Sequence, residues 1–517
     1  MKTVCLYFEI HQNIHLKRYR FFDIGTDHYY YDDYENERSI VETAEKSYIP
    51  ALKTLIEMAK ANAGFFKCAI SLSGTALELL ENHTPEVIDL LQELNATGCV
   101  EFLAEPYSHG LSFMKDKETF VEEVTRLDKK ITKLFGKKPE VFRNSCLAYS
   151  DEIGETVAEM GYKGMLAEGA KHILGWKSSH YVYSNARDPR LAVLLRDASL
   201  SEDISLRFND SSWSEYPLFA DRYAQWIADA PADDQCINLF MELCALGIFQ
   251  PLSSNILEFL KALPEQLKQR GVTFSTPSEV IANNKPVGPI VVEYPTSWVD
   301  EERDLSAWLG NKMQQEACEK LYAVAERVRA TKNKKLKQDF DYLQASNNFR
   351  FMSTKHGGGY RGIYDSAYDA FTNYMNIVGD FAARVNDMYG GAENEEINAL
   401  LTLIQNQGEA IEQKDKEIEK LKAMIKKLGG EPAKAEKKPA EKKPAAKKAP
   451  AKKAPAKKEE PKAEVKAEPV AEVKPAEAPK AEPAKKPAAK KAPAKKAEPA
   501  KKPAAKKAPA KKPSEKK

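Results

Sequence analysis

The sequence predicts an α/β fold: a barrel of parallel strands followed by a helical segment, a coiled-coil helix and a disordered tail. Three observations support this prediction. Short apolar runs alternate with longer amphipathic ones over the first 280 residues, as repeated strand–helix units require. Isoleucine recurs at every seventh position after residue 396. The last 87 residues contain no aromatic residue, Leu, Ile or Met with which to build a core.

The predicted strands are short apolar runs with β-branched and aromatic members, a pattern typical of strands that are covered on both faces. Seven or eight such runs favour a closed barrel over an open sheet. The runs are VCLYFEI (4–10), FKCAISLSG (66–74), CVEFLAE (99–105), VFRNSCLAY (141–149), YKGMLAE (162–168), LAVLLRD (191–197), INLFME (237–242) and VTFSTPSE (272–279).

Polar side chains gather at the ends of these runs. Because the carboxyl ends of parallel strands meet at one face of a barrel, we expect the polar groups to share that face. They are His11, Gln12, Glu101, Glu105, Asn144, Glu168, Asp197 and Glu242.

The chain from about residue 300 to 381 has helical periodicity, which predicts helices packed on the barrel. Isoleucine then occupies every seventh position from Ile397 to Ile425, with leucine three residues later in three of the repeats. Ile at a and Leu at d favours a parallel two-stranded coiled coil, and so a homodimer through 395–430. Gln407 and Lys414 at d positions weaken it. The alternative is an amphipathic helix packed on its own chain.

The tail, residues 431–517, has 29 lysines and 12 glutamates, an excess of 17 positive charges. Since the whole chain carries +2, residues 1–430 carry −15. Proline and lysine self-repulsion oppose collapse, which predicts a disordered tail. Such a segment can neutralise phosphates but not read bases, so we expect non-specific contact with a polyanion or nucleic acid. A solvated tail that binds nothing is the alternative.

The location of the protein is predicted from its cysteines and its apolar segments. The seven cysteines lack CxxC spacing, and most lie in apolar runs, as reduced thiols do. No apolar stretch reaches about 18 residues, so no membrane span is expected. The N-terminal run has no small-residue cleavage site. These features predict a cytoplasmic protein.

The expected divisions are a barrel (1–290), a helical domain (291–394), the coiled-coil helix (395–430) and the tail (431–517).

Five segments form a series that runs along the barrel sequence: HQN (11–13), GCVEF (98–102), LAEGAKHILGW (166–176), LFMELCALG (239–247) and TPSEV (276–280). In order and spacing they resemble the motifs of glycoside hydrolase family 57, in particular its α-amylase branch. HQN is similar to the family's HQP, and GCVEF to its GxVE. The third and fourth segments correspond to those of the catalytic nucleophile and the acid/base.

The resemblance implies a (β/α)7 barrel that hydrolyses α-1,4-glucans such as starch, glycogen or maltooligosaccharides with retention of configuration. Retention requires two carboxyl groups about 5 to 5.5 Å apart. Glu168 matches the catalytic nucleophile, and Glu242 matches the acid/base. The substrate-binding residues that we expect are His11, Gln12, Glu101, Trp176 and Asn347.

Several positions depart from the family's pattern. Glu242 stands where active members carry Asp, in a segment resembling MDYETFGEH, and its polar neighbours are replaced by apolar ones. A misplacement of about 1 Å can slow a reaction about a hundredfold, although burial can still raise the pKa of Glu242 as an acid requires. Asn13 replaces the proline of HQP, and Asn347 and Asn348 replace the family's Asp and His.

These departures leave three functions open: an α-glucan hydrolase or transferase, a non-catalytic glucan-binding or scaffolding protein, and a nucleic-acid binder in which the tail is primary. The eight histidines show no HxH or HExxH spacing, so no metal site is expected, and no cofactor. The aromatic residues between 19 and 34 predict either a packed loop or a sugar-binding surface.

Overall fold

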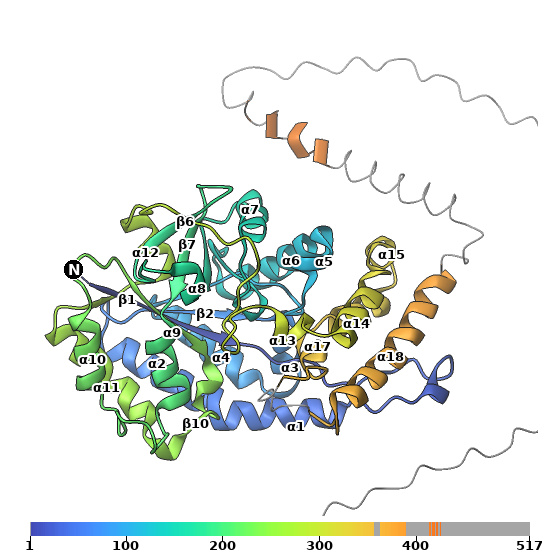
Figure 1. Ribbon diagram of the computed structural model, residues 1–517, viewed down its shortest axis with the longest axis horizontal. Helices are drawn as coiled ribbons and strands as arrows, with labels where there is room; N and C mark the ends of the chain where they lie inside the picture. The colour runs from blue at the N-terminus through green and yellow to red at the C-terminus, as the bar shows by residue number, and fades with distance from the viewer. Residues whose placement is uncertain are drawn as a thin grey trace, which may run out of the picture. The chain divides into compact units, whose positions relative to one another are not determined.

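Seven parallel strands close into a barrel in the computed structural model, which describes residues 2–355 and 362–388 and a few residues between 413 and 424 (Figure 1). Strand pairing runs round the ring from β1 to β2 and β3, from β4 to β5, β7 and β8, and from β8 back to β1. A parallel bridge between Ala104 and Phe142 joins β3 to β4. The predicted (β/α)7 barrel is therefore confirmed. Its strands are β1 (Thr3–Ile10), β2 (Cys68–Leu72), β3 (Val100–Phe102), β4 (Val141–Arg143), β5 (Gly164–Glu168), β7 (Ala192–Arg196) and β8 (Ile237–Glu242).

Five further strands of the described residues lie outside the ring, and two of them, β9 (Leu246–Gly247) and β10 (Gln250–Pro251), pair with each other in a separate sheet. The eighth predicted run forms only β11 (Thr273–Phe274), which pairs with the start of β1, before Pro277 begins helix α12 (Pro277–Asn283). The strand β6 (Val182–Asn185), which the sequence did not predict, runs antiparallel to β7. The short β12 (Pro289–Ile290) pairs with β6.

The middle of the barrel is filled by apolar side chains because alternate residues of each strand point inward. The residues between them face the surrounding helices, so each strand reads as a nearly continuous apolar run. The inward cluster includes Cys5, Tyr7, Ala69, Leu103, Val141, Leu166, Leu194 and Phe240.

The connecting helices surround the barrel (Figure 1). In α6 (Lys117–Phe135) the sequence sets both ends: the Asp116 side chain accepts a hydrogen bond from the Thr119 N–H, and Gly136 follows with a φ of 80°. The other helices of this part are α1 (Asp33–Thr43), α2 (Ile49–Ala61), α3 (Gly74–His83), α4 (Pro85–Ala96), α5 (Ser112–Lys115), α7 (Asp151–Glu159), α8 (Lys171–Leu174), α9 (Ala198–Glu202), α10 (Ala220–Asp229) and α11 (Ile256–Gln269).

Six helices of the described residues follow β12 in the chain and lie at one side of the barrel, drawn in yellow and orange in Figure 1. Their buried side chains belong to the same apolar cluster as those of α1 to α4, so the two parts share a core. They are α13 (Ser306–Leu309), α14 (Lys312–Tyr322), α15 (Ala325–Ala330), α16 (Lys334–Leu343), α17 (Ser346–Arg350) and α18 (Ala367–Met388).

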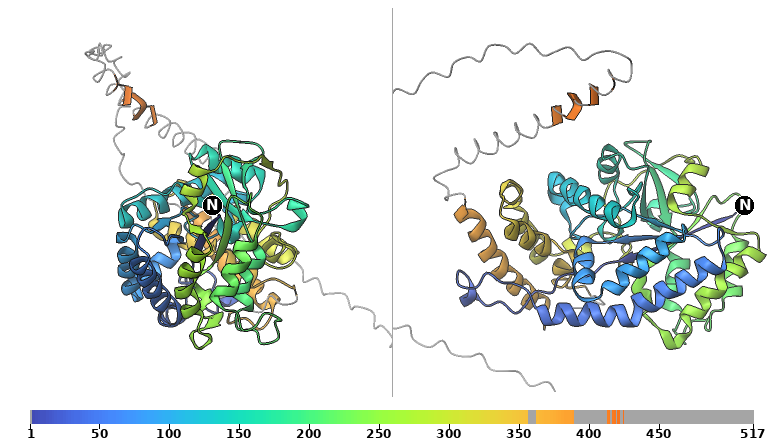
Figure 2. Two further views of the ribbon diagram at one scale, coloured as in Figure 1. Left: turned by 90° about the vertical axis from the view of Figure 1, so that its left-hand side faces the viewer. Right: turned by 180° about the vertical axis from the view of Figure 1, so that it is seen from behind.

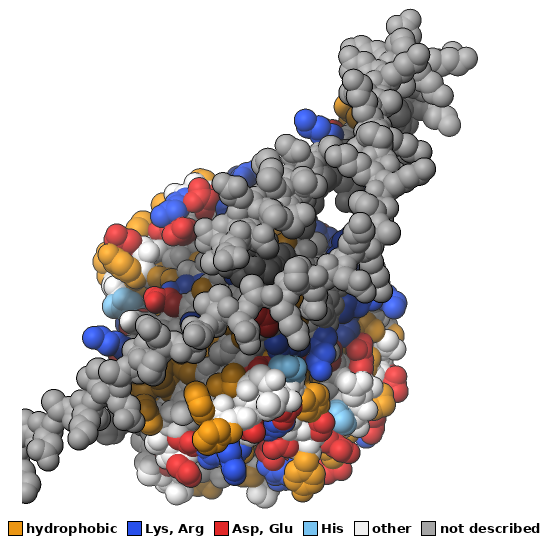
Figure 3. Space-filling view, turned by 90° about the vertical axis from the view of Figure 1, so that its right-hand side faces the viewer, with side chains coloured by type: hydrophobic (Ala, Val, Ile, Leu, Met, Phe, Trp, Pro, Cys, Tyr) orange, Lys and Arg blue, Asp and Glu red, His pale blue; other side chains and the backbone are white. Residues whose placement is uncertain are grey.

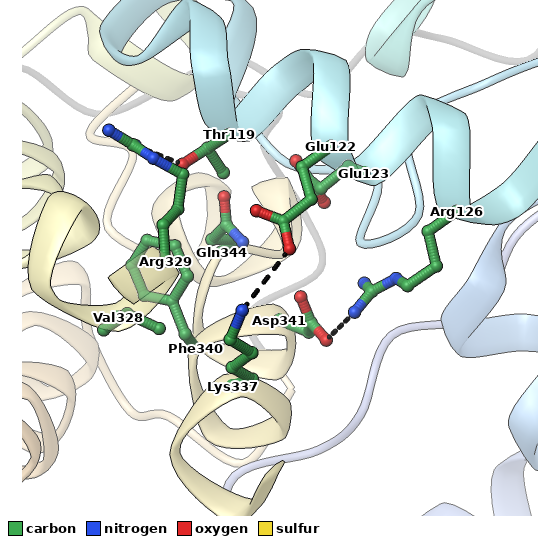
Figure 4. A pocket seen from close by; sticks show the side chains of 10 residues that line it. All are labelled: Thr119, Glu122, Glu123, Arg126, Val328, Arg329, Lys337, Phe340, Asp341 and Gln344. Carbon is green, nitrogen blue, oxygen red and sulfur yellow. Dashed lines mark hydrogen bonds and ion pairs between the residues drawn. The ribbon is translucent and has the colours of Figure 1, made fainter. Parts of the chain in front are cut away.

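Polar contacts tie these helices to α6 around a small cavity of about 30 Å³ (Figure 4). Arg126 Nη1 lies 2.8 Å from Asp341 Oδ2, and Lys337 Nζ lies 3.5 Å from Glu122 Oε1. Burial raises the pKa of Asp341 to about 7, although Arg126 opposes the shift. The pairs fix α16, and with it α17, against the barrel.

The loop between β1 and α1 packs along α18, as both Figure 1 and the right-hand view of Figure 2 show. Tyr19 and Tyr30 are buried there, and the Tyr30 hydroxyl donates to Asp380 Oδ2 at 2.5 Å. Phe21 and Phe22 are exposed. Of the seven aromatic residues between Tyr19 and Tyr34, three (Tyr19, Tyr30 and Tyr31) are therefore buried and serve packing, and the other four are exposed.

The predicted coiled coil falls mostly, and the tail wholly, outside the described residues. Within the described part of the chain no helix is long and apolar enough to cross a membrane. All seven cysteines are free thiols. On the side drawn in Figure 3, basic and acidic side chains are interspersed among apolar ones.

Candidate active site

The carboxyl end of the barrel carries polar side chains at the inward positions that follow the apolar core. Each lies two residues beyond an inward apolar residue of its strand, and so points to the same side. Six lie on the strands and Glu105 follows β3, so that each of the seven strands supplies one: Glu9, Ser71, Glu105, Arg143, Glu168, Arg196 and Glu242.

Two of the four carboxylates are paired with arginine. The buried Arg143 places Nη2 2.5 Å from Glu9 Oε2, and Arg196 Nη1 lies 3.1 Å from Glu168 Oε2. Glu105 is farther from Arg143, at 3.9 Å, and accepts a hydrogen bond from Ser71 at 2.6 Å. The two arginines therefore balance the charges of Glu9 and Glu168.

The other two carboxyl groups, Glu105 and Glu242, hold protons near neutral pH. Burial raises the pKa of Glu105 to about 8. Burial, and then the charge of Glu9, raise the pKa of Glu242 to about 7, while Arg143 and Arg350 oppose the shift. A carboxylic acid with a pKa near the working pH can donate and take back a proton. Glu242 is thus suited to acid/base chemistry.

A cleft of about 890 Å³ opens over this end of the barrel, within the range of small-molecule sites. Glu9 and Glu242 lie at its base, and they are direct neighbours in register on β1 and β8. Three of the predicted site residues besides Glu242 also line it. They are His11, Gln12 and Asn347. The lining further includes Trp298, Trp308 and Phe249.

Two stacked histidines form one wall of the cleft, with ring centroids 3.9 Å apart. His11 Nε2 lies 3.1 Å from Asn347 Oδ1, and its Nδ1 lies 2.9 Å from Ser73 Oγ. An amide oxygen accepts only, so Nε2 of His11 carries the proton. Burial lowers the pKa of both His11 and His109 well below the usual value. Both rings are therefore neutral donors and acceptors.

Glu168 does not line this cleft. Its side chain has 0% exposure, and Arg303 Nε lies 3.8 Å from Oε1, the oxygen to which Arg196 Nη1 also donates at 3.4 Å. Arg303 also donates to the backbone oxygen of Trp298, whose ring lies over Arg143 and Arg196. The segment from Trp298 to Arg303 thus covers Glu168.

The structure places two predicted sugar contacts elsewhere. Glu101 points to the amino end of the barrel, where its Oε2 accepts a hydrogen bond from the Ser278 N–H at 2.9 Å. Trp176 is 94% exposed and is not among the residues that line the cleft. Neither reaches a ligand in the cleft in this arrangement.

The residues that shape the site and that sequence reasoning missed include Glu9, Arg143, Arg196, Trp298 and Arg303. Glu9 and Arg143 had a signal, since a charged residue within an apolar strand run must find a buried partner. Trp298 and Arg303 follow the last barrel strand, and no periodic pattern marks them.

Seven parallel strands with strand-end carboxyl groups around a cleft define a barrel of the glycoside hydrolase type. The chain belongs to glycosyl hydrolase family 57, whose sequence model matches residues 5–293. A protein of Methanocaldococcus jannaschii, provisionally named an alpha-amylase, is 33% identical over 408 residues, which cover 76% of this chain and 85% of that protein.

Two solved structures share the fold at low sequence identity. The 4-alpha-glucanotransferase of Thermococcus litoralis has a TM-score of 0.54 and 15% identity, covering 74% of this chain and 60% of that one. A family 57 branching enzyme of Thermococcus kodakaraensis, solved with glucose, has a TM-score of 0.55 and 14% identity, covering 74% and 90%. The chain spans about three fifths of the glucanotransferase.

Proposed function

We propose that this protein is a retaining α-glucan hydrolase of the α-amylase type, with Glu242 as acid/base and Glu168 as nucleophile. The observation that carries the proposal is Glu242, an acid with a pKa of about 7 at the base of a large cleft. Glu242 is the last residue of β8, at the place in the sequence that corresponds to the acid/base residue of the family. His11, Gln12 and Asn347 line the same cleft and supply neutral hydrogen-bonding groups for sugar hydroxyls.

In the first step Glu242 would protonate the glycosidic oxygen while the Glu168 carboxylate attacks the anomeric carbon. The glycosyl ester that forms on Glu168 would then be cleaved by water, with Glu242 taking the proton of that water. Burial raises the pKa of Glu168, while Arg196 and then Arg303 oppose that shift and so favour the ionised form that attack requires. For the attack, the segment from Trp298 to Arg303 must first uncover Glu168.

One observation favours a second function, glucan binding without hydrolysis. The Glu168 side chain is fully buried between Arg196 and Arg303, and a carboxylate that stays there cannot reach a sugar. In that case the cleft would hold a glucan, and the chain would act as a binding or scaffolding protein.

Release of reducing ends from amylose and glycogen by the full chain separates the two functions. Hydrolysis that is lost in both Glu168→Gln and Glu242→Gln supports the enzyme. The matched control is Glu140→Gln, which removes a carboxylate paired with Lys163 just before β4, at the far end of the barrel, and should hydrolyse like wild type. Binding of maltoheptaose without hydrolysis supports the second function.

The remaining assignments rest on the sequence. We propose domains at 1–290 and 291–394, a dimer through 395–430, polyanion contact through 431–517, and a cytoplasmic location. Deletion of 395–430 should turn a dimer into a monomer in sedimentation, and a monomeric wild type would reject the coiled coil. Truncation after Gly430 should abolish a gel shift of nucleic acid at about 50 mM salt; unchanged binding would reject the tail contact.

A further inference from the structure

Glu9 is a buried residue in the lining of the cleft, and one of its carboxyl oxygens lacks a hydrogen-bond donor within the described part of the chain. Arg143 Nη2 binds Oε2 at 2.5 Å. Oε1 lies 2.9 Å from His109 Nε2 but receives no hydrogen bond from the described residues. That nitrogen already accepts from Arg143 Nη1 at 3.0 Å and from the Cys146 N–H at 3.3 Å. Two acceptors thus face each other, and a buried oxygen without a donor is costly.

The position of Glu9 relative to Glu242 indicates what the donor is. The two residues are partners in register on parallel strands, which lie about 4.8 Å apart, and registered side chains point to the same face. Both line the cleft. A single sugar ring bound against Glu242 therefore also lies against Glu9.

The carboxylate is held rigidly for this contact. Arg143 is fully buried, and the ring of Trp298 lies over its guanidinium at 5.0 Å. Oε2 is fixed by Arg143, and Oε1 is a buried oxygen, without a donor among the residues that the structure describes, in a residue that lines the cleft. A preorganised charged acceptor recognises a hydroxyl donor more strongly than a mobile or neutral one does.

We propose that Glu9 accepts a hydrogen bond from one hydroxyl of the sugar ring that lies against Glu242, and so fixes and selects that ring. The inference rests on the proposed binding of α-glucan in the cleft, and it holds for a hydrolase and for a binding protein alike. The ligand class is a hexopyranose with a hydroxyl at the recognised position.

Glu9→Gln tests the contact because the amide changes the hydrogen bonding without changing the shape. Its oxygen would stay on Arg143, and its NH₂ would donate to His109 Nε2, leaving no acceptor for the sugar. A hydrogen bond to a charged group is worth about ten- to a hundredfold in affinity. Glu9→Asp, which keeps the charge but withdraws it by one methylene, is a second variant should the first fail to fold.

The experiment measures the Kd of the full chain for methyl α-maltoside and for its monodeoxy analogues by titration calorimetry. We expect wild type to bind one analogue at least about tenfold more weakly than the parent. Glu9→Gln should bind the parent more weakly by a similar factor and no longer distinguish it from that analogue. Glu140→Gln, which removes a carboxylate paired with Lys163 at the far end of the barrel, should keep the wild-type pattern.

Two results would overturn the inference, and they differ in what else they reject. If both Glu9 variants discriminate among the analogues as wild type does, Glu9 makes no contact, and the glucan cleft stands. If wild type binds neither methyl α-maltoside nor maltoheptaose, the proposed function falls and the role of Glu9 falls with it.

Discussion

Replacing Glu242 with Gln should stabilise the protein above neutral pH while it abolishes hydrolysis. Burial, then the charge of Glu9, raise the pKa of Glu242 from 4.5 to about 7. Between these values the folded protein keeps a proton that the unfolded chain releases. The stability from this group is thus fully present below pH 4.5, the unfolded value, and is lost as the pH rises through about 7.

The size of the effect follows from the pKa shift, at about 1.4 kcal/mol for each unit. A rise from 4.5 to about 7 corresponds to at most about 3 kcal/mol of unfolding free energy. Water in the cleft screens the charge, which makes this an upper limit. Glutamine does not titrate, so the variant keeps the stability that wild type loses.

Urea denaturation at pH 5 and pH 8 measures the unfolding free energy of both proteins. At each pH the unfolding free energy of wild type is subtracted from that of Glu242→Gln. The difference between the values at pH 8 and pH 5 then contains no pH-independent effect of the amide. We expect this difference to be about 2 kcal/mol in favour of the variant. Glu140→Gln should give a value near zero. Equal advantages at the two pH values would refute the raised pKa of Glu242.

Two further predictions concern other charged groups. His180 lies 2.7 Å from the Asp197 carboxylate and 2.6 Å from that of Asp234. Burial lowers the pKa of His180, but the hydrogen bonds to the two aspartates outweigh it and raise the pKa. The stability that His180 contributes is therefore present below about pH 6.5 and is lost as the pH rises through the raised pKa. His180→Asn should therefore lower the unfolding free energy by about 1 to 3 kcal/mol at pH 6 and by less at pH 9, and an equal loss at both would contradict this. Arg303→Gln should raise kcat/KM on maltoheptaose about tenfold by uncovering Glu168, whereas an unchanged or lower value would show that Arg303 does not cover it.

Much of the barrel could be predicted from the sequence because each inner strand is an apolar run that must be covered on both faces. Glu168 and Glu242 could be placed at strand ends by the same pattern. Which end of the barrel a residue occupies was harder to predict. Glu101 and Glu105 lie in one run and share a face, but β3 begins at Val100, so Glu101 points to the amino end.

The pairing of the site residues could not be predicted from any single strand. Arg143 meets Glu9 across the barrel, and that contact depends on how the seven strands are staggered when they close. Trp298 and Arg303 reach Arg196 and Glu168 from a segment without secondary structure after the barrel. Such contacts are set by tertiary packing and leave no periodic signal in the sequence.

The central claim is that the cleft cleaves α-glucan through two carboxyl groups with retention. The direct test is to add the full chain to maltoheptaose and follow the new anomeric protons by ¹H NMR before mutarotation. The account predicts that the first products carry α-anomeric ends. Products with β-anomeric ends, or intact maltoheptaose after prolonged incubation, would contradict it.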